Sequence, residues 1–195
     1  MKFGGSSVAS AERMREVADL ILSFPEERPV IVLSAMGKTT NNLLLAGEKA
    51  LSCGVSNVSE IEEFTSLKEL HLRTIQELGL DVSIISEHLE KLDQLLNGIA
   101  MVKELTLRTK DKLVSFGERL STRIFAAYLN KLGAKAQQGS HPQSTATCPR
   151  EGIIPVRVRI LIIKTPGTII TKKRYERGLI AQYGPEAKRN MARYV

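Results

Sequence analysis

The chain has 195 residues, of which 43% are hydrophobic and 25% are charged. It is long and apolar enough for one domain with its own core, and this composition is not that of a disordered protein. No window is uniformly apolar over the ~18 residues that a membrane-spanning helix needs. The start has the pattern of neither a secretory signal nor a transit peptide. Two cysteines, Cys53 and Cys148, lie too far apart for a disulfide framework or a zinc site, so we expect a reducing compartment.

The net charge of +7 is unevenly distributed. Residues 1–149 carry 17 Lys/Arg and 18 Asp/Glu, whereas residues 150–195 carry 11 Lys/Arg and 3 Asp/Glu, a net charge of +8 in the last quarter. This asymmetry indicates either a basic binding surface or a segment separated from its acidic partners.

Two strand–loop–helix units open the chain. Residues 1–3 read as the end of a strand that runs into the loop GGSS, and Ser10 is placed to cap a helix. The β-branched run at 30–34 predicts a buried parallel strand, which enters the loop AMGKTTN. Asn41 or Thr40 would cap the helix that follows. This order of elements is typical of an α/β sheet.

Helical periodicity then dominates up to residue 132. Ser59 and Glu62 form a capping-box pattern ahead of one helix. The last helix begins near Thr106, and we expect it to pause at the FGE sequence of 116–118. The expected helices cover residues 10–24, 41–54, 61–78, 83–96 and 106–132, and the later strands cover residues 134–138, 154–163 and 168–171.

The sequence pattern changes at about residues 138–141. A loop-like segment, GSHPQSTATCP, follows the strand expected at 134–138, and a turn is expected at the Pro-Gly of 166–167. The last residues have only weak periodicity. We therefore place a boundary at this point of the chain.

The glycine pair Gly4–Gly5 follows a strand and precedes hydroxyls and a helix. Backbone N–H groups approach an anion closely where side chains are absent, and the start of a helix favours negative charge. Lys2 would add a point charge for a phosphoryl group. A plain tight turn explains the same four residues, and the GxxxxGK[ST] phosphate loop is absent.

Two further segments could contribute to a site. The sequence SAMGKTTN lies at the carboxyl end of the second strand, where open α/β sheets bind ligands, although it also reads as a simple strand–helix connection with a solvated Lys38. Glu118 follows a glycine at an expected helix start, where a carboxylate compensates the helix dipole without further function. We expect the three histidines to be packing or surface residues rather than catalysts.

Three motifs in order carry a resemblance to a known family. KFGGSSV, VIVLSAMGKTTNNLL and LVSFGERLSTRIFAAYLNKLG resemble the opening of aspartate kinases, the plant monofunctional type in particular, over residues 1–138. These enzymes have the amino-acid kinase fold, an αβα sandwich. They transfer the γ-phosphoryl group of ATP to the β-carboxylate of L-aspartate.

The resemblance implies a role for each candidate residue. Lys2 would be the catalytic contact to the transferred phosphate, beside a phosphate loop made of Gly4, Gly5 and Ser6. Thr40 and Glu118 would bind aspartate, and Glu118 would pair with its ammonium group. ATP, accompanied by Mg²⁺, would be the cofactor, and no metal site on the protein is expected. Such chemistry needs positioning and charge neutralisation rather than a strong base.

The chain also departs from the family pattern. HPQS, PREGIIPVRV and PGTIIT, at residues 141–171, are similar to the far end of the same kinase domain. The TTDDF and GRGGSD motifs between the two ends are missing, and so are most of the first strand and the ACT domains. We therefore expect an incomplete αβα sandwich that lacks central strands. Residues 1–138 form its N-terminal part, residues 139–171 its C-terminal end, and residues 172–195 a basic tail that we expect to be mobile.

The resulting hypothesis is a truncated aspartate kinase with little or no turnover, acting at the first step towards lysine, threonine and methionine. Its location would be the chloroplast by resemblance, and otherwise the cytoplasm. Two alternatives remain. The first is a non-catalytic regulatory partner that forms oligomers with intact aspartate kinase. The second is a nucleic-acid binder acting through residues 150–195, which the low aromatic content of 5% disfavours.

Overall fold

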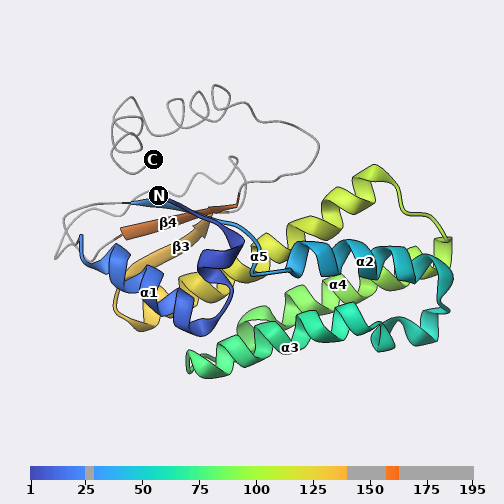
Figure 1. Cartoon of the computed structure of the whole chain (residues 1–195), viewed down its shortest axis with the longest axis horizontal. Helices are drawn as coiled ribbons and strands as arrows, with labels where there is room; N and C mark the ends of the chain where they lie inside the picture. The colour runs from blue at the N-terminus through green and yellow to red at the C-terminus, as the bar shows by residue number, and fades with distance from the viewer. Residues whose placement is uncertain (25–28, 140–156, 163–195) are drawn as a thin grey trace.

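The computed structural model describes residues 1–24, 29–139 and 157–162 (Figure 1). The turn expected at 166–167, the strand expected at 168–171 and the tail from residue 172 lie outside them. The described strands form one parallel sheet in the order β1-β2-β4-β3. Their bounds are Lys2–Phe3 for β1, Val30–Leu33 for β2, Lys135–Gly139 for β3 and Arg157–Ile162 for β4.

Strand β4 comes from beyond the expected boundary in the chain, yet it lies inside the sheet. Ile31 of β2 is in register with Ile160 of β4, and Gln138 of β3 is in register with the same residue from the other side. The strand expected at 154–163 is confirmed for its central part. All pairings are parallel, as the strand–loop–helix order predicts, and the α/β fold class is confirmed.

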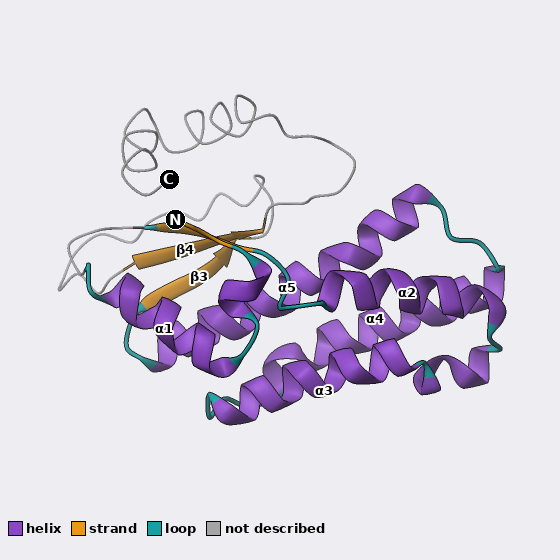
Figure 2. Cartoon of the chain, in the orientation of Figure 1, coloured by secondary structure: helices purple, strands orange, loops and turns teal. Residues whose placement is uncertain are grey.

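The helices form two groups (Figure 2). Helix α1 and the C-terminal half of α5 lie along the sheet, whereas α2, α3, α4 and the N-terminal half of α5 form a bundle that extends away from it. The α-helices are α1 Ala11–Leu22, α2 Thr39–Ser52, α3 Glu62–Glu77, α4 Ser83–Val102 and α5 Leu107–Lys131, and the short 3-10 helices are η1 Gly5–Val8 and η2 Val55–Glu60. None of the helices described is long and apolar enough to cross a membrane.

The cap predicted at Ser10 is confirmed, and Thr106, near which a helix start was expected, also caps its helix. The Ser10 hydroxyl accepts a hydrogen bond from the backbone N–H of Arg13 (3.3 Å), and the Thr106 hydroxyl accepts one from the N–H of Thr109 (3.1 Å). Each bond satisfies one of the N–H groups that the first turn of a helix leaves without a partner.

Two other predicted caps are wrong. Helix α2 starts at Thr39, before Asn41 and Thr40 could cap it, because Met36 and Gly37 already form a turn in which the Thr39 N–H donates to the Met36 carbonyl. Ser59 lies inside η2, so Ile61, which has no side-chain cap, precedes α3. In both places the turn before the helix displaces its start by two or three residues.

The predicted pause in α5 at residues 116–118 is also wrong, because α5 is continuous from Leu107 to Lys131. Gly117 is there for packing. A Cβ atom at this position would lie 2.8 Å from the Cβ of Ala35, 3.1 Å from the Cγ2 of Thr39 and 3.3 Å from a Cδ of Leu43. The glycine therefore lets the loop after β2 and the first turns of α2 approach α5 closely.

His71 is fully buried in α3, as the packing role predicted for it requires. Its Nδ1 lies 2.8 Å from the Leu67 carbonyl oxygen, and because a carbonyl oxygen only accepts, Nδ1–H is the donor. Burial lowers the pKa of His71 below its usual value, with the bond to Leu67 acting in the opposite direction. Burial, together with Arg123 and Arg119, lowers the pKa of His88 as well.

These shifts predict a stability that falls on mild acidification. The unfolded chain binds a proton at each histidine near pH ~6.5, but folded His71 and His88 bind theirs only at lower pH, so protonation favours unfolding. The stabilisation is complete above that pH and is lost as the pH falls below it. We expect the melting temperature to drop between about pH 7.5 and 5.5, and to drop less for His71→Leu. Thermal melts over this pH range measure how the melting temperature of the wild-type chain and of His71→Leu changes with pH. An equal change in both proteins would contradict the lowered pKa of His71.

Two glycines in helix interiors provide a matched test of the packing at α5. Replacing glycine by alanine favours a helix by about 1 kcal/mol. At Gly98 of α4 nothing lies within 4 Å of an added Cβ, so Gly98→Ala should raise the melting temperature. Gly117→Ala should lower the melting temperature, because the Ala35 backbone must move to make room for the added methyl group. The expected loss of unfolding free energy is about 1–3 kcal/mol. A stabilised Gly117→Ala variant would refute the close approach.

Candidate functional site

The glycine loop lies directly after β1. Gly4 is extended and exposed, and Gly5 begins η1, whose Val8 is fully buried and anchors the turn. Lys2 on the strand and Ser6 in the turn are exposed. No neighbouring atom lies within 4 Å of the Cβ position of Gly4, so the main chain there is open to a ligand.

The loop after β2 packs against this glycine loop. The Gly37 N–H donates to the Gly5 carbonyl (3.0 Å), and the Ser34 N–H donates to the Phe3 carbonyl (3.1 Å). A Cβ atom on Gly5 would lie 2.6 Å from the Ala35 carbonyl oxygen, so only glycine fits. Gly37 has a φ of +47°, which favours glycine as well. The two loops therefore meet at the carboxyl ends of parallel strands, where open α/β sheets bind ligands.

Glu118 lies in the middle of α5 rather than at a helix start. Dipole compensation therefore does not explain it, and that interpretation was wrong because Gly117 does not interrupt the helix. The Glu118 side chain is buried, with 6% of its surface exposed. It directly follows Gly117, whose Cα faces Ala35. Burial makes a carboxylate expensive unless a cation or hydrogen-bond donors offset its charge.

Residues that the sequence analysis did not single out hold this arrangement together. The buried Ser121 hydroxyl donates to the Ser34 carbonyl (2.9 Å) and lies 3.0 Å from the Glu118 carbonyl. The Gln138 amide donates to the Thr122 hydroxyl (2.8 Å), which ties β3 to α5. The available signal was a serine and a threonine three and four residues after Glu118, on the same face of a continuous helix.

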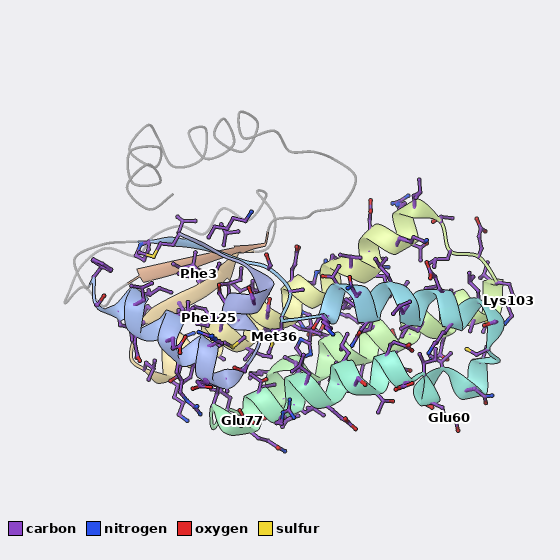
Figure 3. The ribbon with its side chains drawn as sticks, in the orientation of Figure 1. Phe3, Met36, Glu60, Glu77, Lys103 and Phe125 are labelled. Atoms are coloured by element: carbon purple, nitrogen blue, oxygen red, sulfur yellow. The ribbon has the colours of Figure 1, made fainter. Side chains whose placement is uncertain are left out.

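The structure thus brings together the segments that carry the candidate residues: the glycine loop, the loop after β2 with the start of α2, and α5. Lys2 lies on β1 directly before the loop that holds Gly4, Gly5 and Ser6, and Thr40 lies half-buried in the first turn of α2. Figure 3 shows Phe3 and Phe125 at the sheet end with Met36 close by, whereas Glu60 and Lys103 lie at the far end of the bundle. The described ranges contain no group of three or more His, Cys, Asp or Glu side chains placed to hold a metal ion.

Comparisons with known proteins match this same part of the chain. Residues 1–169 match the model of the amino acid kinase family. Aspartokinase 1, chloroplastic, of Arabidopsis thaliana is 78% identical over 138 residues, which is 71% of this chain and 24% of that protein. Lysine-sensitive aspartokinase 3 of Escherichia coli is 31% identical over 138 residues, covering 70% of this chain and 29% of that protein.

A solved structure agrees with these sequence matches. The crystal structure of E. coli aspartokinase III in complex with aspartate and ADP has a TM-score of 0.61 and 30% identity, over 71% of this chain and 30% of that one. The chain therefore spans about a quarter of the length of the plant relatives that it matches. The fold, the glycine loop and the matched family model lead to one conclusion: the chain belongs to the amino acid kinase family.

Proposed function

We propose that the chain is an aspartate kinase that retains the phosphate loop and half of the substrate site. The reaction would transfer the γ-phosphoryl group of ATP to the β-carboxylate of L-aspartate, the first step towards lysine, threonine and methionine. The observation that carries the proposal is the meeting of three segments at Ala35, whose carbonyl faces Gly5 and whose Cβ faces Gly117 beside Glu118. The match to plant aspartokinases over 138 residues supports it, and the family match over residues 1–169 contains all three segments.

The phosphate end of ATP fits the glycine loop. The main chain at Gly4 is open, and Lys2 is exposed on the strand that leads into this loop. Backbone N–H groups and an ammonium ion neutralise phosphate oxygens, and Mg²⁺ would arrive on the phosphates of the nucleotide. ATP would supply the transferred group, while Lys2, Gly4, Gly5 and Ser6 would hold it in place.

The aspartate would lie against α5 and the start of α2. A buried carboxylate such as Glu118 binds an ammonium group strongly, because little water competes for either charge. The half-buried Thr40 hydroxyl would add a hydrogen bond to the substrate. With the ammonium group fixed at Glu118, the β-carboxylate at the other end of the molecule would be directed towards the phosphate loop.

The plant relatives are named as chloroplastic, and we infer the same location for this chain. Association with an intact aspartate kinase as a homo- or hetero-oligomer is part of the proposal. It would supply the groups that the TTDDF and GRGGSD motifs carry in the family and that this sequence lacks.

Ligand preference tests the role of Glu118. Succinate is aspartate without the ammonium group, so the wild-type chain should bind aspartate more tightly, and Glu118→Gln should weaken aspartate binding about tenfold while leaving succinate unaffected. The exposed α3 residue Glu69 offers a matched control as Glu69→Gln, which should change neither affinity. NMR titrations measure the affinities of the three proteins for both ligands. Equal wild-type affinity for aspartate and succinate would argue against the assigned site.

The isolated chain should turn over aspartate and ATP slowly or not at all. Without the residues of the missing motifs, the transition state loses stabilisation that positioning alone does not replace. We expect little or no ADP release from aspartate and ATP by the isolated chain in a coupled assay. A rate comparable to that of an intact aspartate kinase, measured in parallel, would refute this part of the proposal.

A further inference from the structure

A groove runs between α4 and α5 on the helical bundle. Its volume is about 600 Å³. It shares Phe116 and Arg119 with the segment around Glu118, and it includes neither Lys2, the glycine loop nor Thr40. The residues that line it are Lys91, Gln94, Leu95, Gly98, Ile99, Val102, Glu104, Thr106, Thr109, Lys112, Phe116 and Arg119.

The spacing of the lining residues fits a helical occupant. Those on α4 recur every three or four residues from Lys91 to Val102, and those on α5 do the same from Thr109 to Arg119. Each helix therefore presents one continuous stripe to the groove. Two such stripes side by side form a surface against which a third helix can pack its own apolar stripe.

The apolar part of the groove is exposed mainly at the C-terminal end of α4. Ile99 and Phe116 line the groove but are already buried, whereas Leu95 is half-buried and Val102 remains 67% exposed. Gly98 lies in the middle of the α4 stripe, where a Cβ would touch nothing within 4 Å. A partner can thus approach the α4 backbone at this point. The exposed side chain of Met101 (71%) lies next to Val102 at the same end of α4.

The charges around the groove favour an acidic occupant. Lys91, Lys112 and Arg119 line it against the single carboxylate of Glu104. Lys91 forms an ion pair with Glu87, which lies outside the groove, and the Arg119 guanidinium lies 5.6 Å from the centre of the Phe116 ring. Glutamate or aspartate side chains flanking an apolar stripe would pair with these cations.

The same charges disfavour the occupants that this chain itself could supply. Residues 163–195 carry eight Lys/Arg and two Asp/Glu, and residues 140–156 carry one of each, so neither segment supplies the acidic flanks that the groove favours. A symmetric dimer would place one basic groove against another, which is unfavourable for the same reason. The complementary partner is a different chain of opposite charge.

We propose that the α4–α5 groove binds an acidic amphipathic helix of a partner protein, with its apolar stripe over Gly98 and its carboxylates against Lys91, Lys112 and Arg119. This contact does not depend on the proposed catalytic function. It is the helix-in-groove mode of recognition, in which apolar anchors contribute most of the affinity and the charged rim selects the partner.

Two designed peptides of about five helical turns provide the probes. Both carry leucines at alternating three- and four-residue spacing, and the flanking positions are glutamate in one and lysine in the other. Fluorescence anisotropy on the full chain should show binding of the glutamate peptide that weakens several-fold between about 50 and 500 mM salt. The lysine peptide should bind at least about tenfold more weakly. Equal binding of both peptides, or of neither, would overturn the proposal.

Three variants locate the contact. Gly98→Leu places a side chain in the groove from a Cβ position that has no neighbouring atom within 4 Å, and it removes a helix-interior glycine, so it should keep the fold and reduce binding about tenfold or more. Lys112→Glu should weaken the glutamate peptide and strengthen the lysine peptide. Arg73→Glu makes the same charge change at an exposed site on α3 and should leave both affinities unchanged. The proposal would be refuted if Arg73→Glu lost binding while the two groove variants kept it. It would also be refuted if both groove variants bound the glutamate peptide as tightly as the wild-type chain does.

Self-association is measured alongside the peptide experiments. Light scattering should show that Gly98→Leu and the wild-type chain have the same mass in solution, because no copy of the chain occupies the groove. A wild-type dimer that Gly98→Leu converts to a monomer would identify a second copy as the occupant and contradict the assignment to a different protein.

Discussion

The position of the candidate site depends on how closely the main chain at Ala35 is packed from two sides. Gly5 approaches its carbonyl oxygen, and Gly117 approaches its Cβ, at distances that no other residue would allow without a shift of the backbone. Because protein interiors are nearly incompressible, this double contact fixes the phosphate loop, the loop after β2 and α5 relative to one another. The Ser121 hydroxyl strengthens the same junction by donating to the Ser34 carbonyl. The contacts of Gly117 and Ser121 therefore fix the part of α5 on which the buried Glu118 lies.

Most of the N-terminal elements could be predicted because their evidence is local. Apolar residues repeat with the period of the buried face in α1 and α3, and β2 is a short bounded run of β-branched residues. Gly117 could not be interpreted in the same way. A glycine inside a helical pattern is equally consistent with a break and with a close approach, and the deciding partner, Ala35, lies far away in the sequence. The placement of Glu118 at a helix start was wrong for this reason alone.

The position of β4 illustrates a second limit. The alternating pattern at 154–163 predicts a strand, but a strand pattern does not identify the strand beside which it lies. In the structure Ile160 is in register with both Ile31 and Gln138, so β4 separates the two strands that the preceding residues provide. The pairing depends on backbone hydrogen bonds, which every residue type except proline offers equally. The sequence therefore predicts that central strands of the family fold are missing, but it does not predict that β4 lies between β2 and β3 in their place.

The two helix-interior glycines of α4 and α5 show how the site and the groove differ. At Gly117 the absent side chain is explained by what the chain itself packs there, since Ala35, Thr39 and Leu43 occupy the space. At Gly98 no described atom occupies it, although glycine weakens a helix by about 1 kcal/mol relative to alanine. The space over Gly98 is bordered by apolar side chains and then by cations, an order that complements a helix with an apolar stripe and acidic flanks. A close approach by a partner thus accounts for Gly98 in the way that a close approach within the chain accounts for Gly117.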